Sequence, residues 1–318
     1  MIKKILIIAL ALVLCTAALA GCDVKPAEDD GKISVVATIF PEYDFVRAIA
    51  GDKVNTTMLL SPGAEAHSYE PMPEDIQKIQ SCDLFIYVGG ESDSWVGTIL
   101  DSMDTSGMKI ITLMDCVEVV EEEIVEGMQE ETEEAPGEGS EEPEYDEHVW
   151  TSPRNAKMIV QKISDALCEL DVENAEEYKA NTSEYLGKLD ELDALFKQTV
   201  DGGVRKTIIF GDRFPFRYLA DAYGLKYFAA FPGCSTETEP SAKTVAFLID
   251  KVKAENIPVV FHIQLSNERM ANAIAEQTGA SVLLLHSCEG ITKADFDAGK
   301  SYIDIMSANV DALREALS

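Results

Sequence analysis

The chain has few basic residues for its size, because 26 lysines and arginines stand against 57 aspartates and glutamates in 318 residues, a formal charge of −31. About half of that excess lies between residues 118 and 147, which contain fifteen carboxylates and neither lysine nor arginine. A surface of this kind repels the phosphates of nucleic acid. The composition therefore excludes nucleic acid as a partner, and the acidic stretch is predicted to be a solvated insertion.

A long apolar run occurs only at the N-terminus, where MIKKILIIALALVLCTAALAGC has two lysines, an apolar core and small residues before Cys22. This is the layout of a secretory signal, and LAGC is similar to the lipobox of bacterial lipoproteins, in which the cysteine is acylated. The alternative, a stop-transfer helix, is disfavoured because a polar stretch follows at once and a stable span needs roughly 20 apolar residues. We expect a signal peptide over 1–21, lipidation of Cys22 and a tether over 22–32.

Short apolar runs alternate with helical patterns along the remaining chain, which predicts parallel strands covered on both faces by helices. In the first half, strands are predicted at 33–40, 54–60, 83–90 and 109–115, with helices at 41–53, 71–81 and 93–103. In the second half, strands are predicted at 207–211, 225–231, 258–265 and 281–287, with helices at 242–256, 267–279 and from about 294. The repetition predicts an α/β fold of two lobes, 33–165 and 201–318.

One helix is predicted to join the lobes over residues 166–200. Tyr178, Tyr185, Leu189 and Phe196 recur at helical spacing, and Asn174 with Glu177 is a plausible N-terminal cap. The alternative is an ordinary helix of the second lobe. A helical connector would limit the hinge closure that a loop permits.

Histidine is scarce, and each of the four lies near the end of a predicted strand or at a junction between a loop and a helix: His67, His148, His262 and His286. Ligands of open α/β sheets collect at the carboxyl ends of strands, and imidazole is a common ligand of transition metals. Their joint placement favours a metal site between the lobes. The sequence contains neither HExxH nor GxSxG, which disfavours a metalloprotease or a serine hydrolase.

Three segments carry a specific resemblance: VVATIFPEYDFVRAIAGDKV at 35–54, LLSPGAEAHSYEPMPEDIQKIQSCDLFIYVGG at 59–90 and EHVWTSPRNA at 147–156. They resemble the zinc- and manganese-binding lipoproteins of bacterial ABC importers, the cluster A-I substrate-binding proteins. The likeness runs from about residue 33 to the C-terminus. It implies two lobes joined by a rigid helix, with one metal bound in the cleft by residues of both lobes.

By this resemblance, His67 and His148 correspond to the two histidine ligands of the N-terminal lobe. His286 matches a position near the end of a late strand where the family usually has a carboxylate. Together with a carboxylate or water, three imidazoles suit Zn²⁺, whereas Mn²⁺ prefers more oxygen ligands. We therefore expect zinc rather than manganese, by several orders of magnitude, and a loss of this preference in His286→Asp. Affinity should fall as the histidines become protonated near pH 6.5.

The family's third ligand, a His or Glu, falls on Arg213, and a guanidinium cannot coordinate a cation. The neighbouring Asp212 is the first candidate to replace it, His262 is the second, and a site completed by water is the third. Arg213 is instead expected to pair with a carboxylate near the site.

The acidic stretch at 118–147 occupies the place of a loop that is often rich in histidine in zinc-specific relatives. Carboxylates bind zinc more weakly than imidazole does, so the stretch either attracts cations without forming a tight site or is a plain tether. Deletion of residues 121–143 is accordingly expected to leave the affinity nearly unchanged. Asp146 and Glu147 are close enough in sequence to hydrogen-bond His148.

Besides Cys22, the exported chain has an odd number of cysteines: Cys82, Cys116, Cys168, Cys234 and Cys288. At least one thiol is therefore unpaired within the chain. Zinc-binding relatives often have a disulfide in the C-terminal lobe, and the resemblance favours a bond between Cys234 and Cys288 over free thiols.

The sequence thus favours a binding protein, not an enzyme, which captures a divalent metal outside the membrane and delivers it as a monomer to an ABC permease. A lipid-anchored zinc hydrolase is the main alternative, because three histidines with an open position also describe catalytic zinc. A receptor for a metal chelate, or an adhesin, is the third possibility. Bound metal without hydrolytic turnover would favour the binding protein over the zinc hydrolase.

Overall fold

The computed structural model describes residues 31–128, 144–235 and 239–318. The described residues from Ile33 to Ser318 belong to one compact unit, and the fold described below is that of this unit. The predicted signal peptide and Cys22 lie outside the described residues. Within the part that is described, no helix is long and apolar enough to cross a membrane.

The N-terminal lobe is built on a four-stranded parallel sheet with the order β2-β1-β3-β4. Its strands are β1 (Ser34–Ala37), β2 (Asn55–Met58), β3 (Leu84–Tyr87) and β4 (Lys109–Thr112). Its helices are α2 (Phe40–Ala50), α3 (Pro73–Gln80), α4 (Ser94–Asp101) and α5 (Pro153–Leu170), with the short 3-10 helices η1 (Ala66–Ser68), η2 (Glu91–Asp93), η3 (Met114–Cys116) and η4 (Val149–Thr151). The central strands β1 and β3 are almost wholly buried, as their continuous apolar sequences require.

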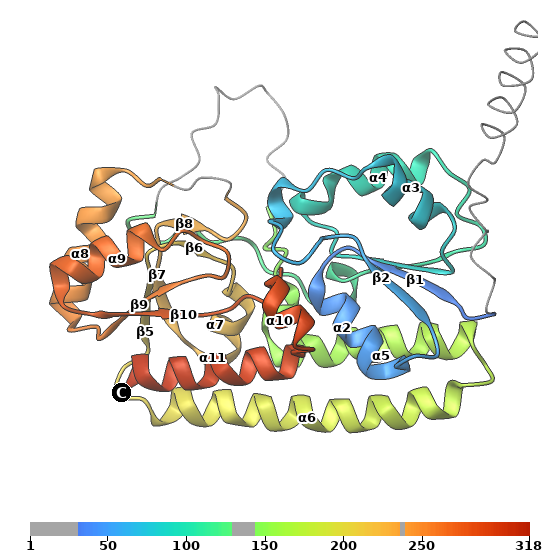
Figure 1. The fold of residues 1–318 in the computed structure, drawn as a ribbon. Coiled ribbons are helices and arrows are strands. Elements are labelled where there is room, and N and C mark those ends of the chain that lie inside the picture. The colour runs from blue at the N-terminus through green and yellow to red at the C-terminus, as the bar shows by residue number, and fades with distance from the viewer. Residues whose placement is uncertain (1–30, 129–143, 236–238) are drawn as a thin grey trace, which may run out of the picture. The chain divides into compact units, whose positions relative to one another are not determined.

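The C-terminal lobe repeats this plan with a second four-stranded parallel sheet in the order β10-β9-β5-β7 (Figure 1). Its strands are β5 (Thr207–Phe210), β7 (Lys226–Phe228), β9 (Val259–His262) and β10 (Ser281–Leu284), and a separate two-stranded sheet is formed by β6 (Arg213–Phe214) and β8 (Phe231–Pro232). Its helices are α7 (Arg217–Tyr223), α8 (Ala242–Glu255), α9 (Arg269–Thr278), α10 (Lys293–Asp297) and α11 (Tyr302–Leu317). The predicted fold class is confirmed.

The long helix α6 (Ala175–Gly202) joins the lobes, running beneath both sheets in Figure 1. It packs against α5 and α2 of the N-terminal lobe and against α11 of the C-terminal lobe. The predicted start at residue 166 is wrong, because α5 continues to Leu170 and the chain turns at Asp171, whose carboxylate accepts hydrogen bonds from Asn174 and Tyr178. Asn174 is the residue before the helix, but its side chain binds Asp171 and does not cap α6.

The acidic insertion is not solvated along its whole length. Its two described arms, residues 118–128 and 144–147, lie antiparallel, with an isolated bridge between Glu121 and Tyr145. The tip of the insertion, residues 129–143, lies outside the described residues. Asp146 and Glu147 are each only 1% exposed, so the prediction of a solvated segment fails at these two residues, while Glu121, Glu123 and Glu126 of the first arm are exposed as predicted.

The first arm of the insertion contacts the C-terminal lobe through polar side chains. Glu122 Oε1 accepts a hydrogen bond from the Cys234 backbone at 3.2 Å, and Tyr227 donates to Glu123 at 3.1 Å. Lys251 Nζ lies 3.3 Å from Glu126 Oε2. These partners come from elements more than 100 residues further along the chain, which is why local sequence pattern did not reveal them.

Candidate metal centre

His67 lies in η1, which follows the carboxyl end of β2 after a turn at Gly63. Gly63 has φ +91°, a conformation that favours glycine, and its N–H donates to the Ile291 carbonyl of the C-terminal lobe at 2.7 Å. The His67 side chain is 5% exposed, and among the described residues its ring nitrogens make no well-aligned hydrogen bond, although carboxylate oxygens of Glu65, Glu147 and Glu289 lie 3.3–3.4 Å away. The turn therefore delivers an imidazole that faces carboxylates at the boundary between the lobes.

His148 is fully buried at the start of η4, directly after the second arm of the insertion. Asp146 Oδ1 accepts from the His148 backbone N–H at 2.8 Å and lies 3.1 Å from His148 Nδ1. This contact fixes the ring and leaves Nε2, which has no hydrogen-bond partner, free to bind a ligand. The predicted support of His148 by Asp146 is confirmed.

Glu147 turns its carboxylate toward the same space. Its oxygens accept hydrogen bonds from the backbone N–H of Ser92, at 3.1 Å, and from the Ser92 hydroxyl. Gly90 passes directly beside it, and a Cβ atom at Gly90 would overlap the Glu147 side chain. The absence of a side chain at Gly90 is thus a condition for the buried position of Glu147.

Glu289 enters the space from the C-terminal lobe, on the loop that follows β10. Cys288 has φ +66°, an uncommon conformation for a residue with a side chain, and it reverses the chain between His286 and Glu289. The Glu289 N–H donates to Ser287 Oγ at 3.2 Å, and its carbonyl accepts from the Phe40 N–H at 3.3 Å. The residue is 5% exposed.

These four residues, His67, Glu147, His148 and Glu289, form what we call the His/Glu group. One potential ligand atom from each lies within 4.8 Å of all the others. His67 Nε2 is 3.4 Å from Glu147 Oε1, His67 Nδ1 is 3.3 Å from Glu289 Oε1, and His148 Nε2 is 3.8 Å from Glu289 Oε1. Over the described ranges, no other set of three or more histidine, cysteine or acidic residues converges in this way.

The burial of the group makes it receptive to a cation. A buried polar atom without a partner costs free energy, and here unpaired imidazole nitrogens face two buried carboxylates. Burial lowers the pKa of His148, but Asp146 and the surrounding carboxylates outweigh burial and raise it to about 9. Carboxylates likewise raise the pKa of His67. A metal ion therefore competes with a proton well above the pH of about 6.5 that the sequence suggested.

His286 and Asp212, which the sequence predicted as ligands, are not members of the His/Glu group. His286 Nδ1 accepts from the Cys288 N–H at 3.0 Å, and burial lowers the pKa of the ring to about 4. Asn309 of α11 makes two hydrogen bonds to the His286 backbone: its Oδ1 accepts from the His286 N–H, and its Nδ2 donates to the His286 carbonyl. The two Asp212 oxygens accept hydrogen bonds from the backbone N–H groups of Arg213 and Ile263. This carboxylate therefore links the start of β6 to the end of β9.

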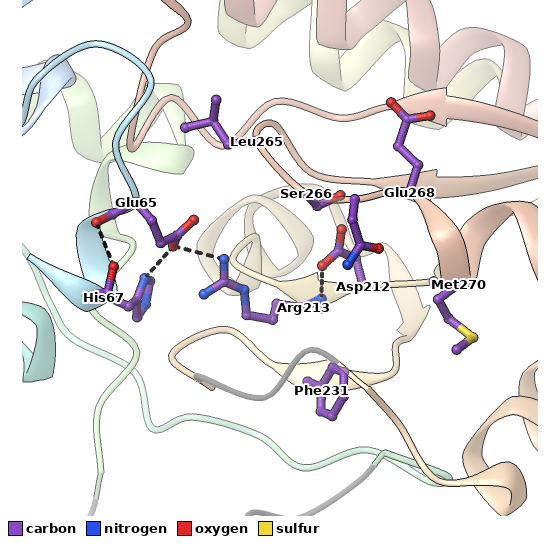
Figure 2. Close-up of a pocket in the computed structure, with 12 residues that line it drawn as sticks. Glu65, His67, Asp212, Arg213, Phe231, Leu265, Ser266, Glu268 and Met270 are labelled. Atoms are coloured by element: carbon purple, nitrogen blue, oxygen red, sulfur yellow. Dashed lines mark hydrogen bonds and ion pairs between the residues drawn. The ribbon is translucent and has the colours of Figure 1, made fainter.

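His262 is also outside the group; it is the last residue of β9, and its Nε2 lies 3.9 Å from Glu268 Oε1. The predicted pairing of Arg213 with a carboxylate is confirmed, because Arg213 Nη2 lies 2.9 Å from Glu65 Oε1. Arg213, Glu65 and His67 line one side of a cavity of about 240 Å³ between the lobes (Figure 2).

The predicted disulfide between Cys234 and Cys288 is not formed. Both residues are free thiols, as are the other three cysteines of the described residues. Cys288 is fully buried against the apolar core, where burial and the nearby Asp44 raise its pKa. Cys234 instead lies beside Glu122, Asp146 and Glu147, whose charges add to burial in raising the thiol pKa. The two thiols thus face different surroundings.

Sequence reasoning missed Glu147 and Glu289 as members of the group. Glu147 was expected only to support His148, and Glu289 was passed over in favour of His286, three residues earlier. For Glu289 the available signal was an acidic residue in a segment that is otherwise mostly apolar or small, whereas Glu147 ends an acidic run and had no such signal. The backbone reversal at Cys288, which selects Glu289, has no sequence signature.

Comparison with known proteins places these features in context. The family described as zinc-uptake complex component A, periplasmic, matches residues 35–316. The high-affinity zinc uptake system protein ZnuA of Bacillus subtilis (strain 168) is 34% identical over 310 residues, which cover 96% of this chain and 95% of that protein. The zinc-binding lipoprotein AdcA of Streptococcus pneumoniae (strain ATCC BAA-255 / R6) is 32% identical over 302 residues, which cover 95% of this chain but 59% of AdcA.

Solved structures agree with the sequence comparison. The metal-dependent lipoprotein YcdH from Bacillus subtilis superposes with a TM-score of 0.75 at 32% identity, covering 90% of this chain and 100% of that one. The Zn(II)-bound ZnuA-like domain of Streptococcus pneumoniae AdcA gives 0.74 at 30% identity, covering 90% and 99%. The matching family is a metal-binding component of a transport system and not an enzyme family, as the sequence predicted. With its two parallel sheets, its connecting helix and its His/Glu group, the chain belongs to the family of periplasmic zinc-uptake components.

Proposed function

We propose that this chain captures Zn²⁺ outside the cytoplasmic membrane and delivers it to the permease of an ABC importer. The observation that carries the proposal is the His/Glu group, in which buried imidazole nitrogens without partners and two buried carboxylates from both lobes converge within 4.8 Å. The zinc-binding relatives support the choice of metal, and the family supports the role in uptake.

The proposed ligands are His67, His148, Glu147 and Glu289. Two imidazole nitrogens and two carboxylate oxygens form a four-membered donor set, which suits the tetrahedral preference of Zn²⁺. Manganese favours more oxygen ligands and a higher coordination number. This set replaces His286 and Asp212 of the sequence prediction with two glutamates, so it is richer in oxygen than the three imidazoles on which the predicted zinc preference was based. The choice of zinc therefore rests on the four-ligand set and on the zinc-binding relatives.

The proposed role also requires tethering and docking. The lipobox-like LAGC motif supports acylation of Cys22, which would hold the protein on the outer face of the membrane. The helix α6, which packs on both lobes, supports release by local rearrangement in preference to wide hinge closure. A monomer is the expected form for docking on the permease.

The test is a zinc titration by competition with a chelator, preceded by metal analysis of protein purified without added metal. His67→Ala and His148→Ala are each expected to weaken zinc binding by at least a hundredfold, because each removes a ligand. His262→Ala is the matched control, since His262 lies outside the group, and it should bind as the unmodified protein does. Circular dichroism establishes that each variant is folded.

Unchanged zinc affinity in both His67→Ala and His148→Ala would contradict the assigned site. Hydrolytic turnover by the zinc-loaded protein would contradict a transport role. Zinc bound at a stoichiometry of one, without turnover, is the expected result.

A further inference from the structure

Arg213 projects from β6 of the C-terminal lobe toward the N-terminal lobe, and its guanidinium is held from both sides. Nη2 donates to Glu65 Oε1 at 2.9 Å (Figure 2). Nη1 donates to the Ser235 carbonyl at 3.1 Å. Its backbone N–H donates to Asp212 Oδ1 at 2.9 Å. The side chain is only 12% exposed. The positive charge is thus fixed at the wall of the cavity, beside the His/Glu group.

Glu65 is a carboxylate of the cavity wall that lies next to the His/Glu group without belonging to it. Its Oε1 is 3.4 Å from His67 Nδ1, and Glu289 Oε1 lies 3.3 Å from the same nitrogen. Figure 2 shows Glu65 between His67 and Arg213, so the oxygen that is nearest to the group is also the oxygen that Arg213 binds. Glu65 Oε1 thus lies almost as close to His67 Nδ1 as the oxygen of Glu289, which is a member of the group.

We propose that Arg213 determines the metal preference of the site by holding Glu65 out of the coordination sphere. The inference rests on the proposed function and extends it to selectivity. Arg213 acts through Glu65 and does not itself touch the metal, so it is a positioning residue. The ion pair between Arg213 and Glu65 thus limits the metal ligands to two nitrogens and two oxygens.

The chemistry of the two cations gives the reason. A third carboxylate would add one or two oxygen ligands and one negative charge, and oxygen-rich sites of higher coordination suit Mn²⁺ better than Zn²⁺. Arginine is suited to prevent this, because its guanidinium is always charged and binds carboxylates with fixed geometry. The Arg213 side chain is 12% exposed and that of Glu65 is 36% exposed, so salt screens the pair only in part.

The test compares zinc and manganese affinities by competition titration in Arg213→Met, which keeps an unbranched side chain but removes the charge and the donors. The ratio of zinc to manganese affinity is expected to fall at least tenfold, or about 1.4 kcal/mol, relative to the unmodified protein. In the double variant Arg213→Met with Glu65→Gln, the ratio should return to that of the unmodified protein, because the amide adds no negative ligand. Glu65→Gln alone should leave the ratio unchanged.

Two matched variants separate selectivity from folding. Arg217→Met removes a half-buried arginine of the same lobe that pairs with Asp221 and Glu123, and it should leave the ratio unchanged. Arg213→Gln retains a donor for the Ser235 carbonyl. It is expected to lower the ratio of zinc to manganese affinity as Arg213→Met does. It replaces that variant if the methionine variant does not fold.

Cobalt(II) provides an independent readout, because the intensity of its visible absorption decreases as the coordination number increases. The bands should weaken in Arg213→Met and recover in the double variant. Equal losses of zinc and manganese affinity in Arg213→Met, or a reduced ratio that persists in the double variant, would overturn the inference while leaving zinc binding by the unmodified protein intact. Absence of zinc binding by the unmodified protein would overturn the proposed function itself.

Discussion

Glu289 and His286 lie three residues apart after β10, and only Glu289 faces the His/Glu group. Glu289→Gln is expected to weaken zinc binding by at least tenfold, because an amide replaces a charged ligand. His286→Asn should bind zinc with nearly unchanged affinity, since the amide oxygen can still accept the Cys288 N–H bond that His286 Nδ1 accepts. Isothermal titration of both variants distinguishes the two ligand sets, and the opposite order of effects would restore His286 as a ligand.

Gly90 is required for space and not for an unusual backbone angle, since its φ is −94°. In Gly90→Ala the new methyl group would overlap Glu147, so this carboxylate must leave its hydrogen bonds to Ser92. We expect zinc affinity to fall by at least tenfold. Gly97→Ala is the control, because its Cβ meets no atom within 4 Å on α4, and alanine there should leave binding unchanged and stabilise the helix slightly. Equal affinity in the two variants would contradict this account.

At the level of residues, the sequence predicted what local motifs encode. His67 and His148, which belong to the His/Glu group, were predicted because their segments resemble the family's two histidine-bearing segments. Glu289 was not found, because its direction depends on the left-handed backbone at Cys288 and on a hydrogen bond to Phe40 in the other lobe. Neither determinant can be deduced from residue type.

Among the elements, the strands were the most predictable, because parallel strands buried on both faces have nearly continuous apolar sequences. Helix ends were less predictable: the final helix was expected as one segment from about 294, but it is divided into α10 and α11 around Gly299, whose φ is +71°. The antiparallel pairing of the insertion's arms and the burial of Asp146 and Glu147 were not predicted. Glu122 and Glu123 have partners on the C-terminal lobe, which composition alone does not reveal.

Tyr218 of α7 links both arms of the insertion to the C-terminal lobe. Its hydroxyl donates to the Asp146 carbonyl at 2.7 Å and accepts from the Val120 N–H at 3.3 Å. Tyr218→Phe is expected to destabilise the protein by about 1–2 kcal/mol, because both buried bonds are lost. It should also weaken zinc binding several-fold, since Asp146 orients His148. Urea unfolding and zinc titration measure the two effects.

Tyr43→Phe is the control for Tyr218→Phe, because no hydrogen bond of the Tyr43 hydroxyl is found among the described residues, and both effects should be near zero. The same contacts revise the expectation for loop deletions. Removing 121–143 also removes the arm that carries Glu122 and Glu123, so it should reduce stability. A deletion restricted to 129–143 is the variant that should retain zinc affinity.

For the molecule as a whole, buried ionisable groups set the response of the metal-free protein to pH. Burial raises the pKa of Asp93 to about 6, and it raises the pKa of Glu42 and of Asp44 as well. Carboxylates outweigh burial to raise the pKa of His148 to about 9, and they also raise that of His67. Each of these groups binds its proton more tightly in the folded state, so its contribution to stability is lost as pH rises through the folded pKa.

The melting temperature of the metal-free protein is therefore expected to fall by several degrees between about pH 6.5, the unfolded pKa of histidine, and pH 9. His286 does not offset this trend, because its lowered pKa of about 4 affects stability only below pH 6.5. With excess zinc the trend should reverse, since the metal needs deprotonated ligands. Calorimetry with and without zinc tests both, and a melting temperature that rises with pH in the metal-free protein would contradict the assignment of His148.

The antiparallel arms of the insertion have a further consequence for how the polypeptide could be divided. The bridge between Glu121 and Tyr145, with the bonds from Glu122 N–H to Glu144 and from Asp146 N–H to Val120, joins the two arms on both sides of residues 129–143. The fragment that ends before the tip would contain His67, and the fragment that begins after it would contain the other three members of the His/Glu group. Co-expressed as separate polypeptides, the fragments should associate and bind zinc, while neither should bind alone, so that metal retention on a column would report complementation between them.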